Sequence, residues 1–175
     1  MIERPSNAEF APYFVGYVSL VPEADIMRVL AAQAAEVSAQ TRTIPQEREE
    51  FRYATGKWSI REVLGHLGDA ERVFGHRAFC ISRGEQADLP GFDEKQYVAS
   101  SSFAGCRLPD LVDEFGQLRA SNLIVLRRLD EAAWSRRGSA NGSPASVRAL
   151  AFIMAGHVRH HLQILRTRYA SLEEA

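Results

Sequence analysis

Residues 58–84 read WSIREVLGHLGDAERVFGHRAFCISRG, and this stretch decides the fold class. Ser59 and Glu62 match the capping-box pattern, in which each side chain accepts a hydrogen bond from the backbone N–H of the other residue. Apolar residues then recur at helical spacing until Gly84 ends the pattern. The stretch therefore predicts a long amphipathic helix from Ser59 to about Arg83.

Three further segments have the same period: about Glu23 to Gln40, Pro109 to Leu129, and Ser146 through Leu165 to about Tyr169. Strand signals are weak, and the one Asn-Gly pair, Asn141-Gly142, lies in a Ser/Gly/Pro-rich stretch that we interpret as a loop. Four long helices without strands predict an all-α fold, a four-helix bundle with up-down-up-down order.

The connection between the second and third helices, from Gly84 to Leu108, is long for such a bundle. Long loops inside compact domains are often functional. We expect this one to pack across an end of the bundle, and we keep a role at the site as the alternative.

The composition of the chain limits the classes of function that the protein can have. The chain has 175 residues, 21 Lys and Arg against 22 Asp and Glu, and 46% hydrophobic residues, which suits a single domain over residues 1–175. The near-neutral balance argues against a nucleic-acid partner. The apolar stretch 11–21 is too short to span a membrane and lacks the features of a signal peptide, so a cytoplasmic location is expected.

The five histidines fall in two of the predicted helices. At about 100° per residue, His157 and His161 lie about 40° apart on the apolar face of the fourth helix, which also carries Leu150 and Met154. Arg159 lies on the opposite side. Two inward imidazoles one turn apart can act together as metal ligands.

A third ligand must come from another helix. His66 lies at the margin of the apolar face of the second helix, whereas His76 points toward solvent and His160 lies on a flank of its helix. Three neutral imidazoles suit Zn²⁺, Ni²⁺, Co²⁺ or Fe²⁺ and leave a coordination position open. Core histidines that merely bond to neighbours, or complement a helix dipole, remain the alternative.

Two separated motifs stand out in the sequence: WSIREVLGHLGDAER at residues 58–72 and AGHVRHHLQILRTRY at residues 155–169. The first resembles the second helix, and the second resembles the last helix, of the DinB-like (DinB/YfiT-like) superfamily. The loop 89–94, LPGFDE, and the pair Leu118-Arg119 also fit, so the resemblance extends from about residue 23 to residue 169.

The resemblance implies a four-helix bundle, commonly homodimeric, with a metal site whose ligands fall on His66, His157 and His161. Relatives include thiol-S-transferases that use low-molecular-weight thiols such as bacillithiol or mycothiol, and others are related to maleylpyruvate isomerase. We therefore expect a divalent-metal enzyme, with zinc or nickel favoured over iron, cobalt or manganese. Its substrates would be a small-molecule thiol, or water, and a small electrophile. The alternative is a non-catalytic dimeric bundle that binds a metal or a small ligand.

Other residues could support such a site. Asp69 or Gln163 could accept a ring N–H from a ligand histidine. Arg77, about 20° from His66 around the helix, could hold an anionic substrate group, or it could pair with Glu71 or Asp113.

Three residues have simpler interpretations. Trp58 precedes the capping box and is expected to be a packing residue. Cys80 and Cys106 are expected to be buried, inert free thiols, because neither has a neighbouring histidine in a pattern that suggests a Cys-His pair.

Overall fold

The computed structural model describes residues 2–169. The helices within this range are α1 (Val15–Ser19), α2 (Ile26–Thr41), α3 (Ile60–Ser82), α4 (Glu94–Ala99), α5 (Leu108–Leu126), α6 (Glu131–Ser135) and α7 (Val147–Ile164), and a π-helical turn (Leu165–Tyr169) extends α7. Short strands β1 (Asp88–Leu89), β2 (Arg137–Ala140) and β3 (Ser143–Ser146) form one small sheet. Four 3₁₀ turns complete the described elements: Asn7–Glu9, Pro12–Phe14, Gln46–Arg48 and Phe103–Gly105.

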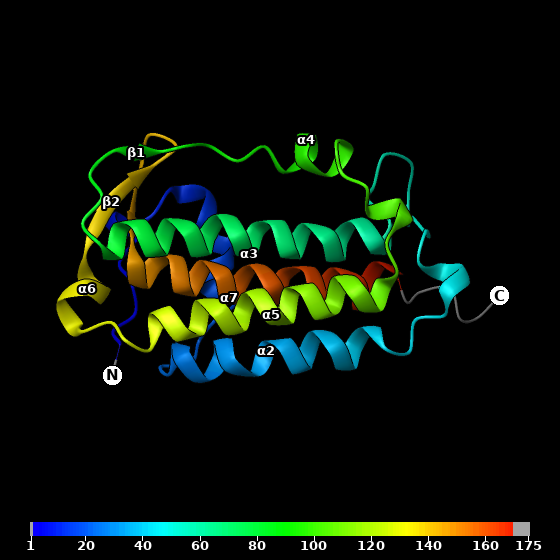
Figure 1. Cartoon of the computed structure of the whole chain (residues 1–175), viewed down its shortest axis with the longest axis horizontal. Helices are drawn as coiled ribbons and strands as arrows, with labels where there is room; N and C mark the ends of the chain where they lie inside the picture. The colour runs from blue at the N-terminus through cyan, green and yellow to red at the C-terminus, as the bar shows by residue number, and fades with distance from the viewer. Residues whose placement is uncertain (1, 170–175) are drawn as a thin grey trace.

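The long helices α2, α3, α5 and α7 lie alongside one another as a bundle (Figure 1). Local sequence sets their ends: Ser59 accepts from the backbone N–H of Glu62 at 3.2 Å, and Glu62 accepts from that of Ser59 at 2.7 Å. Gly84 ends α3 with a positive φ of 91°. The predicted all-α class and four-helix bundle are confirmed.

Helices α3 and α5 run in the same direction. Near the start of α3, Gly65 packs against the ring of Phe103, which lies in the 3₁₀ turn shortly before α5. Further along both helices, Gly75 packs against Asn122. Contacts that advance together along two helices require a parallel pair, and the colours of Figure 1 show the same direction.

Helices α2 and α7 form the second parallel pair. The Gln33 side chain donates to the carbonyl of Ala155, and that of Gln40 donates to the carbonyl of Leu162, both at 2.7 Å. The order is therefore up-down-down-up, and the predicted up-down-up-down order is wrong. The physical reason is the length of residues 83–107, which is sufficient to return along the bundle before α5 begins.

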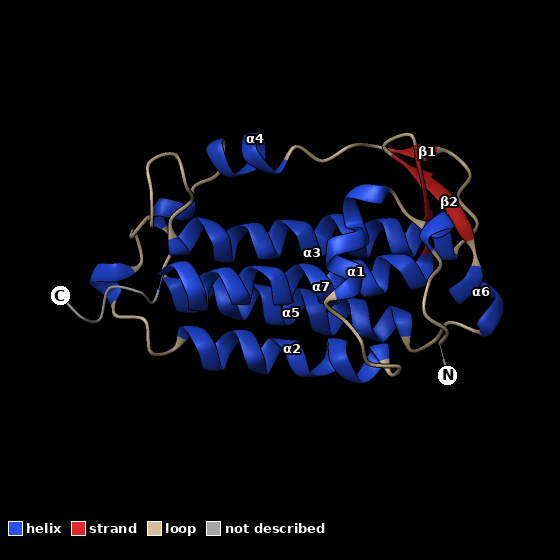
Figure 2. Ribbon diagram, turned by 180° about the vertical axis from the view of Figure 1, so that it is seen from behind, coloured by secondary structure: helices blue, strands red, loops and turns tan. Residues whose placement is uncertain are grey.

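Residues 83–107 pass along the side of α3, as Figures 1 and 2 show from opposite directions. The expectation that this connection packs across an end of the bundle is wrong. It includes β1, which pairs in parallel with β2, and α4, which lies above α3 in both views. The connection therefore covers one side of the bundle.

Asn141-Gly142 is the turn of a hairpin rather than part of an irregular loop. Strands β2 and β3 are antiparallel, and φ is 54° at Asn141 and 67° at Gly142, as a two-residue type I′ turn requires. The strand sequences RGSA and SPAS lack β-branched residues, so the strand pattern gave no signal.

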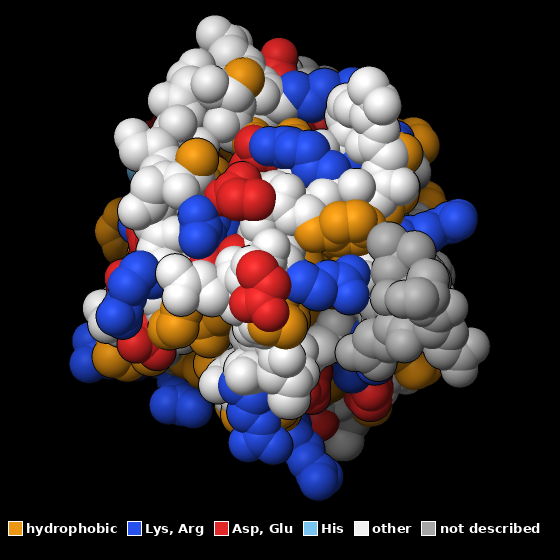
Figure 3. All heavy atoms as spheres, turned by 90° about the vertical axis from the view of Figure 1, so that its right-hand side faces the viewer, with side chains coloured by type: hydrophobic (Ala, Val, Ile, Leu, Met, Phe, Trp, Pro, Cys, Tyr) orange, Lys and Arg blue, Asp and Glu red, His pale blue; other side chains and the backbone are white. Residues whose placement is uncertain are grey.

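The core consists of two apolar clusters, one near the sheet, which includes Phe74 and Leu150, and one near the opposite end, which includes Leu64 and Phe115. The surface at that opposite end mixes cationic and anionic side chains (Figure 3). None of the helices within residues 2–169 has the length and apolar character needed to cross a membrane.

Candidate functional site

Three histidines from two helices meet inside the bundle. His66 lies on α3, and His157 and His161 lie one turn apart on α7. The His157 Nε2 atom is 2.9 Å from that of His66 and 3.1 Å from that of His161. All three residues are buried, so the structure brings together the three histidines that the sequence predicts as metal ligands.

Hydrogen bonding alone does not account for this arrangement. A ring nitrogen has either one N–H or one in-plane lone pair, so the Nε2 of His157 can satisfy only one of its two neighbours. Nitrogens about 2.0–2.1 Å from a tetrahedral cation would lie roughly 3.3 Å apart, close to the distances seen here. The three rings therefore fit a divalent ion better than they fit one another.

Burial favours the neutral form of all three rings, which is the form that binds metal. It lowers the pKa of His66 to about 4, with a smaller contribution from the charge of His160. Burial, and then the neighbouring histidines, also lower the pKa of His157 and of His161. Each ring can therefore offer a lone pair at neutral pH.

Two aromatic residues from irregular segments position the His66 ring. The Trp58 ring centroid lies 4.7 Å away, and Phe92 is stacked nearly parallel to the imidazole at 6.1 Å. Tyr169 in turn holds Trp58, because its hydroxyl donates to the Trp58 carbonyl at 2.6 Å. Trp58 is thus a wall of the site as well as a packing residue, which its sequence position did not reveal.

The other side of the triad is covered by α1. The Tyr17 ring lies 5.4 Å from His157, and the ring of Phe74 lies 5.9 Å from the same imidazole. Burial, followed by the neighbouring Tyr13 hydroxyl, raises the pKa of Tyr17, which keeps its phenol protonated.

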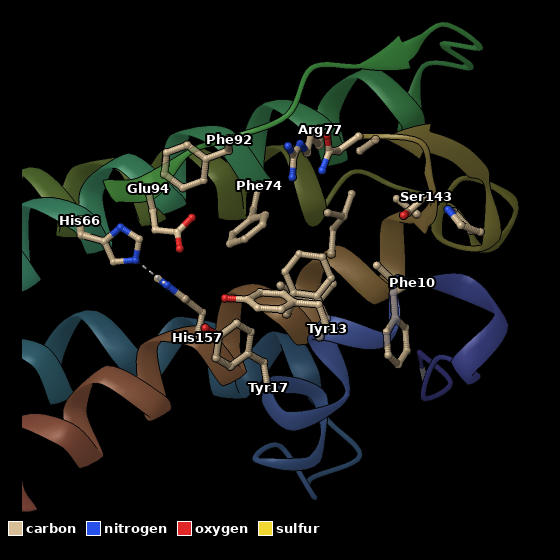
Figure 4. A pocket seen from close by; sticks show the side chains of 18 of the residues that line it. Phe10, Tyr13, Tyr17, His66, Phe74, Arg77, Phe92, Glu94, Ser143 and His157 are labelled. Atoms are coloured by element: carbon tan, nitrogen blue, oxygen red, sulfur yellow. Dashed lines mark hydrogen bonds between the residues drawn. The ribbon is translucent and has the colours of Figure 1, made fainter. Parts of the chain in front are cut away.

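A cavity of about 350 Å³ opens from the triad and extends toward the small sheet. Most of its walls are apolar or aromatic. Figure 4 shows the Glu94 carboxylate projecting into it beside His66, and Arg77 further along. A largely apolar cavity with a few polar groups is typical of a small-molecule site. Its lining includes Phe10, Ala11, Tyr13, Phe14, Tyr17, Trp58, Phe74, Phe92, Leu150 and Ile153.

The proposed acceptors for the ring N–H groups do not serve that role. Asp69 lies in the wall of a separate surface hollow with Phe103, and Gln163 is exposed. The Nδ1 atoms of His66 and His161 have no hydrogen-bond partner within residues 2–169. Aromatic packing, rather than a carboxylate, therefore orients the His66 ring.

The remaining histidines lie outside the triad, as their angles predicted. His160 is half-buried and faces Tyr17, and His76 is exposed. His76 lies one turn before Cys80, and the Cys80 Sγ atom is 3.5 Å from its Nε2. The expectation that neither cysteine has a histidine neighbour is therefore wrong for Cys80, whose spacing of four residues from His76 was the missed signal. Both cysteines are free, as predicted, but they are half-buried rather than buried.

Arg77 forms no ion pair with Glu71 or Asp113. Glu71 instead accepts from Arg119 on α5. The Arg77 guanidinium lines the cavity and donates to the carbonyl of Pro90 at 2.7 Å.

The DinB superfamily family model matches residues 29–165. The chain belongs to the DinB superfamily. No curated protein sequence matches it.

The solved structures that share the fold of this DinB superfamily member include two of low sequence identity. YfiT from Bacillus subtilis, described as a probable metal-dependent hydrolase with an unusual four-helix bundle topology, is 16% identical with a TM-score of 0.78. That alignment covers 86% of this chain and 87% of YfiT. The mycothiol-dependent maleylpyruvate isomerase is 13% identical with a TM-score of 0.66, over 83% of this chain and 61% of that one.

Proposed function

We propose that this protein is a divalent-metal-dependent enzyme whose ion is held by His66, His157 and His161. The observation that carries the proposal is the convergence of three buried Nε2 atoms at one end of a mostly apolar cavity. Zinc or nickel is the favoured ion, with iron, cobalt or manganese as alternatives, because three imidazoles do not choose among first-row metals.

When bound, a divalent ion lowers the pKa of a coordinated thiol or water and so supplies a nucleophile near neutral pH. Three protein ligands leave room for that group, as in catalytic rather than structural sites. We assign the reaction to the thiol-S-transferase type, in which a low-molecular-weight thiol, or water, attacks a small electrophile.

The residues around the triad have separate roles in this proposal. Glu94 would accept the proton released by the nucleophile, because its carboxylate projects into the cavity beside His66 (Figure 4). Tyr17, which stays protonated, would donate a hydrogen bond to charge that develops on the electrophile. Trp58 and Phe92 would keep water from the His66 side of the reacting groups.

The two proteins of similar structure support this class of chemistry. One protein is described as a probable metal-dependent hydrolase and the other as mycothiol-dependent. The first description favours water as the nucleophile and the second favours a thiol. Both alternatives use the same three histidines, so one set of variants tests both.

Metal analysis tests the site. Wild-type protein should bind close to one divalent ion per chain, and His157→Ala should lose most of it. His76→Ala is the matched control, because this exposed histidine lies on α3 outside the triad. Equal metal content in His157→Ala and the wild type would contradict the assignment.

A substrate screen tests the reaction. Metal-loaded protein is mixed with bacillithiol, mycothiol, glutathione or cysteine and a set of small electrophiles, and thiol consumption is measured. Turnover that disappears in His157→Ala and falls at least about tenfold in Glu94→Gln would support the transferase. Activity with electrophiles in the absence of thiol would favour a hydrolase. No turnover under either condition would favour the dimeric, non-catalytic binding bundle.

A further inference from the structure

Arg77 presents a buried positive charge at some distance from the histidines. Its side chain lines the cavity, and the residue is only 6% exposed. The guanidinium donates to one carbonyl, that of Pro90, and lies 5.9 Å from the centre of the Phe74 ring. A guanidinium has five N–H donors, so most of its hydrogen-bonding capacity is left for a ligand.

No carboxylate within residues 2–169 neutralises this charge through an ion pair. Burial lowers the pKa of Arg77, and the field of Asp88 opposes that effect. The Asp88 carboxylate is exposed and accepts instead from Ser139 and from the backbone N–H of Gly142. A buried charge without an ionic partner is costly, and a ligand anion would remove that cost.

The hairpin turn adds polar groups beside Arg77. Asn141 and Ser143 line the same cavity, and the Asn141 N–H donates to the carbonyl of Leu89, one residue before Pro90. Asn141 and Arg77 therefore donate hydrogen bonds to the adjacent residues Leu89 and Pro90. This end of the cavity combines one guanidinium with neutral donors, as carboxylate sites do.

The spacing along α3 separates this end from the metal site. Arg77 follows His66 by eleven residues, which places their Cα atoms about 16 Å apart along the helix and about 20° apart around it. Figure 4 shows both side chains reaching the same cavity, with Phe74 between them. A ligand that reaches both ends must be elongated, with an apolar middle.

We infer that Arg77, with Asn141 and Ser143, forms a carboxylate-binding subsite, and that the substrate is an elongated apolar or aryl carboxylate whose reactive end lies at the histidines. This inference rests on the proposed function for the reactive end only. The subsite itself is a property of Arg77 and the hairpin.

A matched pair of probes tests the subsite without requiring turnover. The affinities of 4-phenylbutanoate and of its neutral amide, 4-phenylbutanamide, are measured by calorimetry with protein as purified and again after chelator treatment. The carboxylate should bind at least about tenfold more tightly than the amide in both preparations, since charge-assisted hydrogen bonds are the stronger ones. If the preference for the carboxylate persists after chelator treatment, it does not come from a metal ion.

Two variants and one control identify the source of the preference. Arg77→Gln should remove the preference for the carboxylate over the amide. Asn141→Asp, which adds a negative charge while keeping the shape of the turn, should reduce this preference about tenfold. Arg83→Gln is the control, because Arg83 is an exposed cation at the end of the same helix and should leave both affinities unchanged. If Arg77→Gln does not fold, Asn141→Asp still decides the question.

Three results would overturn the inference: equal binding of the two probes to the wild type, no measurable binding of the carboxylate at millimolar concentration, or a preference that survives in both variants. A second pair, 6-mercaptohexanoate and 6-mercaptohexanol on zinc-loaded protein, tells whether the thiol or the electrophile carries the carboxylate. Loss of metal binding in His157→Ala with intact probe discrimination would leave the subsite standing. The reverse pattern would leave the metal site standing and remove the subsite.

Discussion

Arg119 is the largest fully buried side chain in the described part of the chain, and it is charged. It donates to both carboxylate oxygens of Glu71 at 2.8 Å and also to the Leu30 carbonyl and to Gln33. This network ties α5 to α3 and α2 at mid-bundle. Arg119→Met would leave the Glu71 carboxylate buried without its cation, and the free energy of unfolding in urea should fall by about 3–5 kcal/mol.

The control for this prediction is an exposed pair between the same two helices. Arg72 on α3 pairs with Glu114 on α5, and both side chains are well exposed. Arg72→Gln should change the free energy of unfolding by less than about 1 kcal/mol. A smaller loss in Arg119→Met than in Arg72→Gln would show that the buried network does not hold the helices together.

At the scale of elements, α1 lies directly against α7 at Gly156. A Cβ atom at this position would lie only 1.9 Å from the Tyr17 carbonyl oxygen. Gly156→Ala must therefore push α1 away, and we expect a loss of roughly 3 kcal/mol or more in urea unfolding. Gly116→Ala in α5 is the matched control, because its Cβ would meet only Ala34 at 4.0 Å and should stabilise by about 0.5–1 kcal/mol. Losses of similar size in both variants would contradict the close contact.

The segment before α1 is fixed to the start of α7 by Glu9. Its carboxylate accepts from Ser146 at 2.8 Å and from Arg148 at 2.7 Å. Burial alone would raise the pKa of Glu9, but the hydrogen bonds from Arg148, Ser6 and Ser146 outweigh it and lower the pKa from 4.5 to about 2. A folded-state pKa below the unfolded one stabilises the protein above about pH 4.5, and that stability is lost as the pH falls toward 2.

We therefore predict that Glu9→Gln is less stable than the wild type at pH 7 by roughly 3 kcal/mol, the equivalent of this pKa difference. The difference in the free energy of unfolding between the two proteins should narrow as the pH falls from 5 to 2, because the wild-type carboxylate is then protonated. Urea unfolding of both proteins across this pH range measures the difference. Two stability curves that stay parallel below pH 5 would refute the role of the Glu9 carboxylate.

Local signals were sufficient to predict the long helices, because their ends depend on neighbouring residues. Ser59 caps α3, Gly84 ends it and Ser146 caps α7, as the sequence indicated. The parallel direction of α3 and α5 depends on contacts between residues far apart in sequence, and no local pattern records it. The hairpin at Asn141-Gly142 was not predicted, because its short strands contain Gly, Ser, Ala and Pro rather than β-branched residues.

At the scale of the whole molecule, the convergence of the histidines was predictable because all three lie on long regular helices, where angle follows from spacing. The walls of the cavity were not, because Trp58 and Phe92 lie outside regular helices. Arg77 was predictable as a cleft residue from its angle around the helix. Its lack of an ionic partner was not predictable, because it depends on the ion pair that Glu71 forms with Arg119 instead. Features on one helix could be derived, and features that depend on tertiary packing could not.

The same arrangement would couple binding of the proposed metal ion to the stability of the whole fold. His66 lies on α3, and His157 and His161 lie on α7, so an ion held by all three would join two helices far apart in sequence. A ligand that binds only the folded state stabilises it by about 2.7 kcal/mol when its concentration is a hundred times its Kd.

Zn²⁺ or Ni²⁺ should therefore raise the Tm of chelator-treated wild-type protein by several degrees, and the increase should saturate with metal concentration. His161→Ala should lose most of the increase, whereas His160→Ala, the adjacent half-buried histidine, should keep it. An equal increase in His161→Ala would mean that the metal acts elsewhere on the chain.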